Sequence, residues 1–441
     1  LTANKNITVL VKESETALQE VHIVGAQRTF VNKKGNIKVN VANSILASTS
    51  NSLDLVSKLP GLQISSDQES ITVIGKGAPL IYIDNQKMTV NDLKSLSVND
   101  IKSIDIINNP SAKYEAEGRA VIQITRKQNK NEGYEIALTE NASLKSHFNN
   151  YSGINASIKK KKLEFKANFQ YNQLQPRESN GFNFNIGHKD SQYSYLATLV
   201  SEKPQFLFGG GIFYQINEDD YLLVNSNART LRETFPIYTD SYQNVNNVKN
   251  NIFTSNANYQ TGLAYNGNIN YVKKLKDIDG QLFFGGQYSS YTQEISSRIA
   301  NQYLGDTTLN SSQNRYQKYH IDVITGRIDF EKKFGSETKF KAGANISSAR
   351  AHAILNYQNY RPDEQYQSYY DYTENNYAGY SQLSEKLGKI NYSAGLRIEN
   401  TKVDGGFNTA GSPLINKNYT YLFPKANIDL PIDSVKTLSM S

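Results

Sequence analysis

Histidine and cysteine, which often carry metal-ion and nucleophilic chemistry, are scarce in this chain: its 441 residues include five histidines and no cysteine. Without cysteine there is no thiol nucleophile, thiolate ligand or disulfide. The histidines are His22, His147, His188, His320 and His352. No two of them have the close spacing of zinc ligands, so the sequence predicts no metal site.

Two glycine-rich stretches could suggest nucleotide binding, but neither has the required pattern. Gly75-Lys76-Gly77 lacks the rest of a phosphate-binding loop, and Gly209-Gly210-Gly211 lies inside a strand-like run. No catalytic constellation emerges elsewhere. We therefore predict that the chain is not an enzyme and carries no cofactor.

The net charge of +7 does not indicate a nucleic-acid partner, because 48 basic residues stand against 41 acidic ones. The one tight basic run, Lys159 to Lys162, lies between two strand-like segments and is typical of a solvated turn. No basic helix accompanies it, so we expect no nucleic-acid binding.

Residues 26–128 have the mixed pattern of a small α+β domain. Segments 52–59 and 91–96 carry polar caps and apolar residues at helical spacing. Strand-like runs surround them at 71–74, 80–83, 104–107 and 120–124.

From Tyr134 onward the helical period disappears and apolar and polar residues alternate with period two. In 163–171, for example, the odd positions from Leu163 to Tyr171 are apolar, whereas the even positions are Glu, Lys, Asn and Gln. This is the pattern of strands with one apolar and one polar face. No apolar run reaches the ~18 residues of a membrane-spanning helix.

The connectors between these strands alternate strictly between short and long. The short ones lie near 159–162, 188–192, 217–220, 273–279, 331–337 and 387–389. The long ones are 143–149, 172–180, 201–206, 230–260, 292–314, 351–374 and 401–418. Short turns on one side and long loops on the other are typical of outer-membrane β-barrels.

Lipid explains the period-two pattern. Hydrocarbon offers no hydrogen-bond partners, so a spanning sheet must pair all its backbone groups between strands. Apolar side chains then contact outer-membrane lipid while polar ones line the lumen. The alternative is a soluble protein of several sheets whose apolar faces pack on each other.

The number of strands predicts an incomplete barrel over 129–441. About fourteen strands lie between Tyr134 and Leu430, and 436–441 resembles the start of another. A barrel that holds a folded domain needs about 22 strands. We therefore expect the chain to be a fragment, or the remaining strands to be supplied separately.

Several motifs, in order, resemble the TonB-dependent receptors, more narrowly the Bacteroidetes-type outer-membrane β-barrel receptors. They are residues 53–62 (LDLVSKLPGL), 71–77 (ITVIGKG), 80–85 (LIYIDN), 101–118, 395–402 (GLRIENTK) and 421–424 (YLFP). The resemblance implies an antiparallel transmembrane barrel with 26–128 as a plug domain in its lumen.

For residues 1–25 the resemblance implies the end of a regulatory domain followed by an energy-coupling segment. That segment is extended and adds as a strand to the sheet of a TonB-type periplasmic energy transducer. The residues expected to bind this partner are Leu18, Glu20, Val21, His22, Ile23 and Val24. An ordinary strand or linker is the alternative.

The resemblance also implies charged contacts between plug and barrel. Asp105 and Glu399 match acidic positions, whereas Asn108 stands where related plugs often carry an arginine. Arg119, just before the last plug strand, is the candidate replacement for that cation.

Capture of a solute is expected at the outer loops and the upper side of the plug. Tyr366, Tyr369, Tyr370 and Tyr372 form the densest aromatic patch, which is also typical of an interfacial aromatic girdle. Expected plug contributions come from Lys76, Asn85, Gln86, Lys87 and Met88.

The resemblance thus implies a receptor that imports a scarce solute when its N-terminal segment is pulled. The alternative function is an accessory barrel subunit with a permanently seated plug. A surface lipoprotein and other outer-membrane subunits are further candidate partners, and the substrate is not readable from the sequence.

Overall fold

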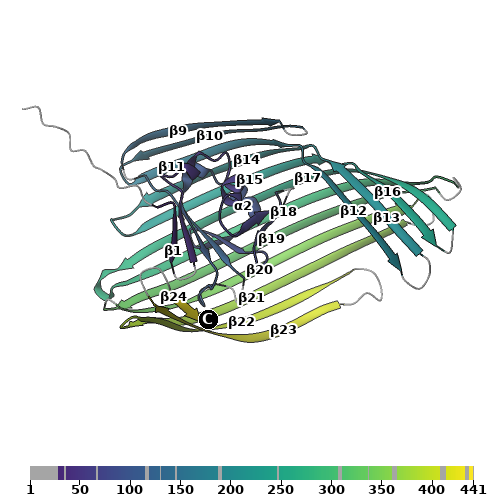
Figure 1. Ribbon diagram of the computed structural model, residues 1–441. Helices are drawn as coiled ribbons and strands as arrows, with labels where there is room; N and C mark the ends of the chain where they lie inside the picture. The colour runs from purple at the N-terminus through teal and green to yellow at the C-terminus, as the bar shows by residue number, and fades with distance from the viewer. Residues whose placement is uncertain are drawn as a thin grey trace, which may run out of the picture.

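The computed structural model describes most of the chain. The described residues are 28–33, 36–65, 68–114, 119–129, 131–144, 147–186, 191–245, 248–305, 310–335, 337–359, 365–407, 414–432 and 437–440. The predicted energy-coupling segment, from Leu18 to Val24, lies outside them. Within them a sixteen-stranded sheet curves around a smaller domain that contains a six-stranded and a two-stranded sheet (Figure 1).

The smaller domain, called the plug below, is the predicted α+β unit. Its main sheet has the order β1-β2-β7-β8-β5-β6, in which only the β5–β8 pair is parallel. These strands are β1 (Phe30–Lys33), β2 (Asn36–Asn40), β5 (Leu80–Ile83), β6 (Gln86–Met88), β7 (Ile101–Ile107) and β8 (Val121–Arg126). The other elements are η1 (Ile45–Ser48), α1 (Ser52–Ser57), β3 (Leu62–Ile64), β4 (Ile71–Val73), α2 (Val90–Lys94) and η2 (Val98–Asp100).

Local capping fixes where the two short helices of the plug begin. At α1 the Asn51 side chain accepts a hydrogen bond from the Asp54 backbone N–H at 2.8 Å. At α2 Thr89 and Asp92 form a reciprocal capping box. Each device satisfies backbone donors that a helix start leaves free.

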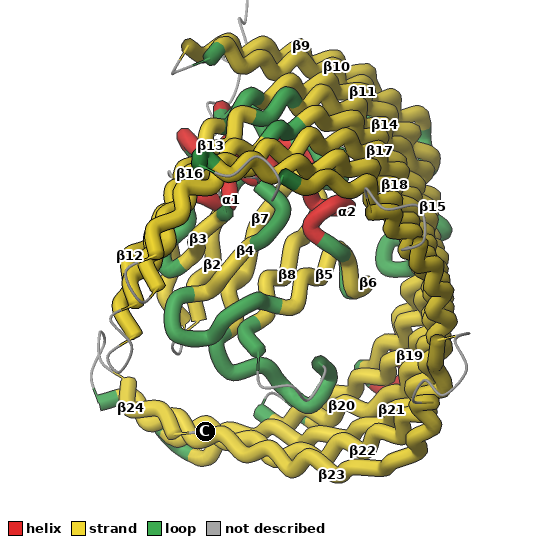
Figure 2. Tube along the Cα trace, turned by 90° about the vertical axis from the view of Figure 1, so that its right-hand side faces the viewer, coloured by secondary structure: helices red, strands yellow, loops and turns green. Residues whose placement is uncertain are grey.

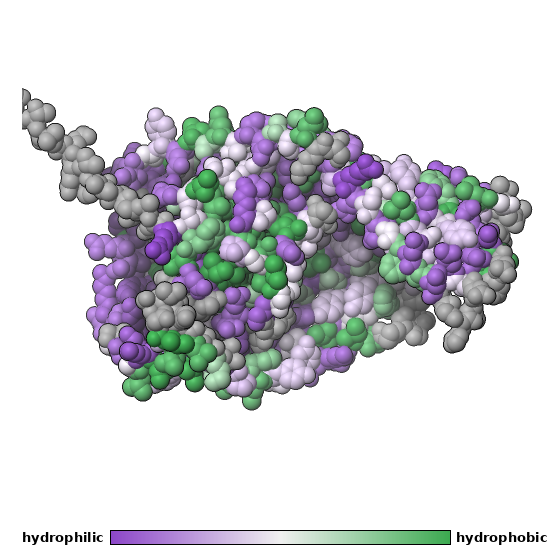
Figure 3. All heavy atoms as spheres, viewed as in Figure 1, coloured by the Kyte–Doolittle hydropathy of each residue, from purple (hydrophilic) through white to green (hydrophobic). Residues whose placement is uncertain are grey.

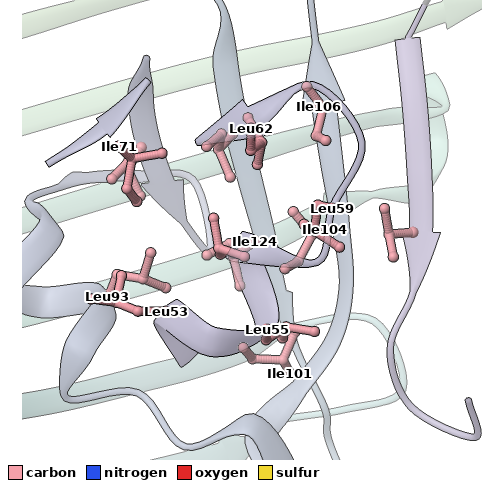
Figure 4. Close-up of a cluster of buried hydrophobic side chains, with 14 of the residues drawn as sticks. Leu53, Leu55, Leu59, Leu62, Ile71, Leu93, Ile101, Ile104, Ile106 and Ile124 are labelled. Atoms are coloured by element: carbon pink, nitrogen blue, oxygen red, sulfur yellow. The ribbon is translucent and has the colours of Figure 1, made fainter. Parts of the chain in front are cut away.

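The plug has a hydrophobic core of its own. Every buried member of its main cluster lies between Val39 and Ile124. Figure 4 shows Leu53 and Leu55 of α1 among isoleucines of β7 and β8, including Ile104 and Ile124. Full burial of one such side chain contributes about 1.5–3 kcal/mol, so this cluster stabilises the plug from within.

The large sheet is entirely antiparallel and runs from β9 to β24. Its strands before the longest ones are β9 (Gly133–Leu144), β10 (Phe148–Lys160), β11 (Leu163–Leu174), β12 (Arg177–Ile186), β13 (Ser191–Val200), β14 (Lys203–Gln215), β15 (Tyr221–Thr234) and β16 (Ile237–Val245). The remainder are β17 (Val248–Leu275), β18 (Gly280–Tyr303), β19 (Ser311–Phe334), β20 (Thr338–Asn359), β21 (Gln365–Leu387), β22 (Ile390–Phe407), β23 (Leu414–Pro431) and β24 (Thr437–Met440), with η3 (Lys276–Ile278) between β17 and β18.

Three breaks divide single passes of the chain into two strands. They lie between β11 and β12, between β13 and β14, and between β15 and β16, and two of them contain Pro176 and Pro236. Proline has no N–H to donate, so it interrupts a ladder. Beyond the breaks β12, β13 and β16 pair with one another and with the outer part of β17, and they diverge from the rest of the sheet (Figure 1). With each broken pass counted once, the strand number is close to the predicted fourteen.

The predicted long loops are wrong: most of their residues are strand. Segments 172–180, 201–206, 230–260, 292–314 and 351–374 fall largely within β11 to β21, and β17 alone has 28 residues. A membrane crossing needs only about 9–11 residues, so these strands continue beyond the bilayer. Ile186 of β12 pairs with Ser191 of β13 at the outer end of the sheet, so the inner turn predicted at 188–192, which lies partly outside the described residues, is wrong.

The two faces of the sheet differ as the alternation predicts. On β17 the side chains of Asn266, Asn268 and Asn270 are at most 5% exposed, whereas Tyr265 and Ile269 are 41% and 49% exposed. The polar face points toward the plug and the apolar face points away from it. Figure 3 shows the open side of the wall, where hydrophobic and hydrophilic side chains lie beside one another.

The sheet curves into a partial barrel with the plug in its hollow, which confirms the predicted fold class. Figure 2, viewed from the end where β12, β13 and β16 lie, shows the plug strands and α2 inside the curved wall. In the part of the chain that the structure describes, β9 and β24 are the two edges and do not pair with each other. None of the described helices is long and apolar enough to cross a membrane.

The assignment of faces predicts opposite effects for neighbouring substitutions on β20. Ile346 is 56% exposed on the apolar face and Ser347 is on the lumen face. We expect Ile346→Arg to destabilise the bilayer-inserted protein by about 2–4 kcal/mol, the cost of an arginine facing lipid near the midplane, and Ser347→Arg to cost much less. Urea unfolding from lipid vesicles, followed by circular dichroism, measures both, and equal effects would contradict the assignment.

Candidate functional site

The contact between plug and wall is polar. On the wall side it is formed by amide and charged side chains from the lumen face of the strands. Asn168 on β11 donates to the Ser95 carbonyl at 2.8 Å, and Asn227 on β15 donates to the Asp92 carboxylate at 3.0 Å. On the opposite side of the hollow, Gln382 on β21 accepts from the Ala112 backbone N–H at 3.0 Å.

Glu69 forms the most highly charged of these contacts. Its carboxylate accepts from Lys203 on β14 at 2.7 Å, from Arg229 on β15 at 2.9 Å and from Lys94 at the end of α2 at 2.9 Å. The three cationic side chains are only 2–6% exposed. One plug carboxylate therefore pairs with two wall cations and one plug cation, and we call this group the Glu69 cluster.

The Glu69 cluster shifts the proton affinity of its plug members. Burial alone would raise the pKa of Glu69, but Arg229, Lys94 and Lys203 outweigh it and lower this pKa to about 2. Burial, with the nearby Arg229, lowers the pKa of Lys94 to about 7, although Glu69 opposes the shift. The carboxylate is therefore ionised at neutral pH.

A second charged contact lies across the hollow, at Asp329 on β19. Asp329 pairs with Arg327 of the same strand at 2.9 Å and with Lys113 of the plug at 3.4 Å, and it accepts from the Tyr380 hydroxyl at 2.7 Å. The Arg327 guanidinium lies 5.7 Å from the centre of the Tyr82 ring. Burial and the nearby Arg327 lower the pKa of Lys113 to about 8, although Asp329 opposes the shift.

The plug residues predicted to bind substrate divide into two groups. Gln86, 2% exposed, donates to Asn270 on β17 at 2.9 Å, and Met88, also buried, accepts from Gln287 at 3.7 Å. The Asn85 side chain accepts from Lys113 at 3.0 Å. These three residues face the wall or the plug itself.

Lys76 and Lys87 are exposed, Lys76 in the turn after β4 and Lys87 in the middle of β6. They do not share the buried setting of Gln86 and Met88. A role in substrate binding stays a prediction for all five plug residues.

The residues predicted to connect plug and barrel lie in other surroundings. Asp105 is on β7 opposite Lys38 and Gln123, and Glu399 pairs with Arg397 two residues earlier on β22. Arg119 is half-buried just before β8. Their role stays a prediction, whereas Glu69, Lys203, Arg229 and Asp329 form ion pairs between the two parts.

Sequence reasoning missed the members of the two ionic contacts, although the sequence held one signal for them. Lys203, Arg229 and Arg327 lie within spanning strands, where a charged side chain must face the lumen. Such residues are candidates for pairing with a plug. Glu69, between β3 and β4, carries no comparable signal, because charged residues are ordinary in a polar loop.

An outer cavity of about 780 Å³ lies among the outer parts of β17 to β21. Its lining is rich in tyrosine and amide side chains and includes two arginines. Among the residues are Tyr259, Tyr316, Tyr357, Tyr366, Arg298 and Arg315. Tyr366 is thus the one predicted tyrosine in this lining.

The other three predicted tyrosines lie on both faces of β21. Tyr370 and Tyr372 share the strand face of Gln382, which contacts the plug, so they face the lumen. Tyr369 is on the opposite face. The predicted patch is therefore not one surface.

One protein family matches part of the wall. Residues 273–441 match the model of a family described as an outer membrane protein beta-barrel family. No curated protein matches the chain.

Three solved structures illustrate the similarity. The ferric-catecholate import receptor Fiu from E. coli K12 has a TM-score of 0.36 at 10% identity, covering 94% of this chain and 85% of that one. The ferric yersiniabactin uptake receptor FyuA from Yersinia pestis has 0.36 at 10%, covering 92% and 84%. The siderophore receptor PirA from Pseudomonas aeruginosa has 0.34 at 11%, covering 93% and 95%.

The family match and the lipid-compatible face of the same strands together give the location of the wall. Hydrophobic side chains such as Ile324 and Ile346, 61% and 56% exposed, cover the outside of the matched strands. The chain is an outer-membrane β-barrel protein. Among the described residues, no three or more His, Asp and Glu side chains lie together as a possible metal site.

Removing the carboxylate of Glu69 tests how much the Glu69 cluster stabilises the plug within the wall. We expect Glu69→Gln to destabilise the seated plug by about 1–3 kcal/mol, because buried Arg229 would lose its ion-pair partner and Lys203 would keep the more distant Glu233, at 3.7 Å, while Glu69 itself is partly exposed. Hydrogen exchange of α2 measures the effect. Asp54→Asn, which breaks the exposed pair with Lys58, is the control and is expected to cost no more than about 0.5 kcal/mol.

The lowered pKa of Glu69 predicts that the contact between plug and wall weakens at acidic pH. Its pKa falls from 4.5 to about 2 in the folded protein, so the contact stabilises the plug fully above about pH 4.5 and loses this contribution as the pH falls toward 2. Urea midpoints of the plug transition, measured from pH 7 to 2, are expected to converge for the natural chain and Glu69→Gln at the acid end. A constant difference would contradict this account.

Proposed function

We propose that this protein is a TonB-dependent outer-membrane receptor of the Bacteroidetes type, which captures a scarce solute at its outer side and imports it. In this proposal residues 1–25 end a regulatory domain and carry the energy-coupling segment, 26–128 form the plug, and 129–441 form the transmembrane wall. A partner energised at the inner membrane pulls on the segment containing Leu18, Val21 and Ile23, and the plug shifts to open the lumen.

The single observation that carries the proposal is the contrast between the inside and the outside of the plug. Its inside is an aliphatic core confined to residues 39–124. Its contacts with the wall are hydrogen bonds and ion pairs, such as those of Glu69 and Gln86. Water replaces polar contacts at modest net cost, so the plug can move without exposing its core.

The outer end supplies a place for capture. The cavity near Tyr366 lies among the outer parts of the wall strands, and its amide and tyrosine side chains suit a hydrated solute. Tyr369, Tyr370 and Tyr372, with Lys76, Asn85, Gln86, Lys87 and Met88, stay assigned to substrate binding as part of this proposal.

The free edges of β9 and β24 support a further element of the proposal. Within lipid an unpaired strand edge leaves N–H and C=O groups unsatisfied. We therefore assign the predicted remaining strands, whichever chain supplies them, to the space between β9 and β24.

The coupling segment is the place to test transport against a permanently seated plug. Strand addition depends on backbone hydrogen bonds, so Val21→Pro with Ile23→Pro is expected to lower binding of the purified TonB periplasmic domain at least tenfold. The matched pair Val21→Ala with Ile23→Ala keeps every N–H and is expected to bind within about twofold of the natural chain. Surface plasmon resonance measures both.

Plug movement is the second readout of the same test. Because the chain has no native cysteine, Ser95→Cys, at a plug position buried against the wall, introduces a single thiol outside the plug core. Energised cells are expected to expose it to an impermeant maleimide, and the proline pair is expected to abolish that labelling. If labelling is the same with and without the proline pair, and in energised and de-energised cells, the alternative function is favoured. The protein would then be an accessory barrel subunit whose partners are a surface lipoprotein or other barrel proteins.

A further inference from the structure

Six aromatic side chains lie on the lumen face of β21, β22 and β23, and we call them the aromatic row. They are Tyr370, Tyr372, Phe407, Tyr419, Tyr421 and Phe423. On β23 the ring centres of Tyr419 and Tyr421 are 5.3 Å apart, and those of Tyr421 and Phe423 are 6.2 Å apart. Higher up, Tyr370 is 6.4 Å from Tyr372 and 4.8 Å from Phe407.

Contacts with the plug show which way these rings face. Lys425 on β23 donates to the Pro110 carbonyl at 3.2 Å, and Gln382 on β21 accepts from Ala112. A side chain at Gly395 on β22 would meet the Ala112 Cβ at 3.0 Å.

Residues an even number of positions apart share a strand face, and the ladders between β21, β22 and β23 have no register shift. The rings of the aromatic row therefore face the same lumen as Lys425, Gln382 and Gly395.

The row runs from the outer end of the wall down to the plug. Tyr370 and Phe407 pair across β21 and β22 near the outer turn, whereas Phe423 lies two residues above Lys425 and its plug contact. Between these two groups, Tyr372 is level with Gly405 on β22 and Ile415 on β23, four residues above Tyr419. The foot of the row is the plug segment 110–113.

These rings are not packed into a core. Tyr421, Phe407 and Tyr419 are 57%, 44% and 38% exposed, although they face the lumen rather than lipid. Polar side chains accompany them on the same face, including the Arg397–Glu399 pair and Thr401. The row therefore offers flat apolar surfaces with hydrogen-bonding groups at their edges.

We propose that the aromatic row is a binding track for a linear oligosaccharide, along which sugar rings pass from the outer end of the lumen to the plug. This inference rests on the proposed transport function and names the substrate class. A sugar ring presents C–H groups on its faces and hydroxyl groups around its rim. The faces stack on aromatic rings, which are amphipathic and rigid, while the rim bonds to neighbouring polar groups.

Two features favour a chain of sugars over other solutes. The rings repeat along one line at 5–6 Å on β23, which suits a ligand built from repeating flat units. The charges nearby, from Arg397, Lys417 and Lys425 against Glu374 and Glu399, nearly balance, which suits a neutral ligand. An extended peptide is the competing class, and the experiment includes it.

The experiment measures binding by the purified full chain in detergent with isothermal titration calorimetry. The probes are α1,4- and β1,4-linked glucose oligomers of one to seven units, and the competitor is a mixture of unstructured heptapeptides. Affinity for at least one oligomer series is expected to rise with each unit and then level off. Each ring removed, by Tyr421→Ala or Phe423→Ala, is expected to weaken binding about two- to tenfold, the range that aromatic contacts support.

Matched variants separate stacking from general damage. Tyr421→Phe keeps the ring and is expected to bind within about twofold of the natural chain. Tyr377→Ala removes a tyrosine of similar exposure, 55%, from the lipid face of β21 and is expected to leave binding unchanged. Unaltered circular dichroism of each variant confirms folding.

The absence of length-dependent oligosaccharide binding, equal losses for Tyr421→Ala and Tyr377→Ala, or preference for the peptides would each overturn the proposal. Because the TonB-binding test uses no solute, it distinguishes failure of this inference from failure of the transport function.

Discussion

The pairing of backbone groups in hydrocarbon is the constraint on which the rest of the structure depends. Lipid supplies no partner for an N–H or C=O group, so every spanning segment must be a strand bonded to its neighbours. That requirement fixes the antiparallel ladder from β9 to β24. It also fixes the side-chain period, because one face of each strand meets lipid and the other meets the hollow.

The hollow then sets the chemistry of what fills it. A wall whose inner face carries asparagine, lysine and arginine is matched by a plug whose surface is polar, and the two meet through contacts such as Glu69 with Lys203. The plug therefore needs its own apolar core, which Leu55, Ile104 and Ile124 help provide. Because the apolar core lies inside the plug and the plug–wall contacts are polar, the plug is structurally distinct from the wall.

The sequence predicted the elements whose two faces differ in polarity and missed those whose faces do not. The 163–171 alternation, from Leu163 to Tyr171, predicted β11 because lipid and lumen demand opposite residues. Above the bilayer both faces of a strand meet water, so 230–260 and 351–374 lose the contrast, although the ladder continues through them. Their Asn, Ser and Tyr content therefore predicted loops where strands exist.

The candidate site was predictable in type more than in residue. The resemblance pointed to charged plug–wall contacts at Asp105 and Glu399, whereas the ion pairs found use Glu69 and Asp329. Glu69 and Lys203 are 134 residues apart in sequence, and only the tertiary fold brings them together. Tyr366 at the outer cavity and Tyr370 on the lumen face came from local composition, which is visible in a single sequence.

The strand breaks at Pro176 and Pro236 affect which parts of the wall can tolerate changes in sequence. Below them, a one-residue slip would turn lipid-facing side chains inward, so the register there tolerates little change. Above these prolines, β12, β13 and β16 pair with one another. Breaks in the chain separate them from β11, β14 and β15, which lie in the membrane part of the wall. Insertions and substitutions in β12, β13 and β16 can therefore change the outer end of the wall while the register within the bilayer stays as it is.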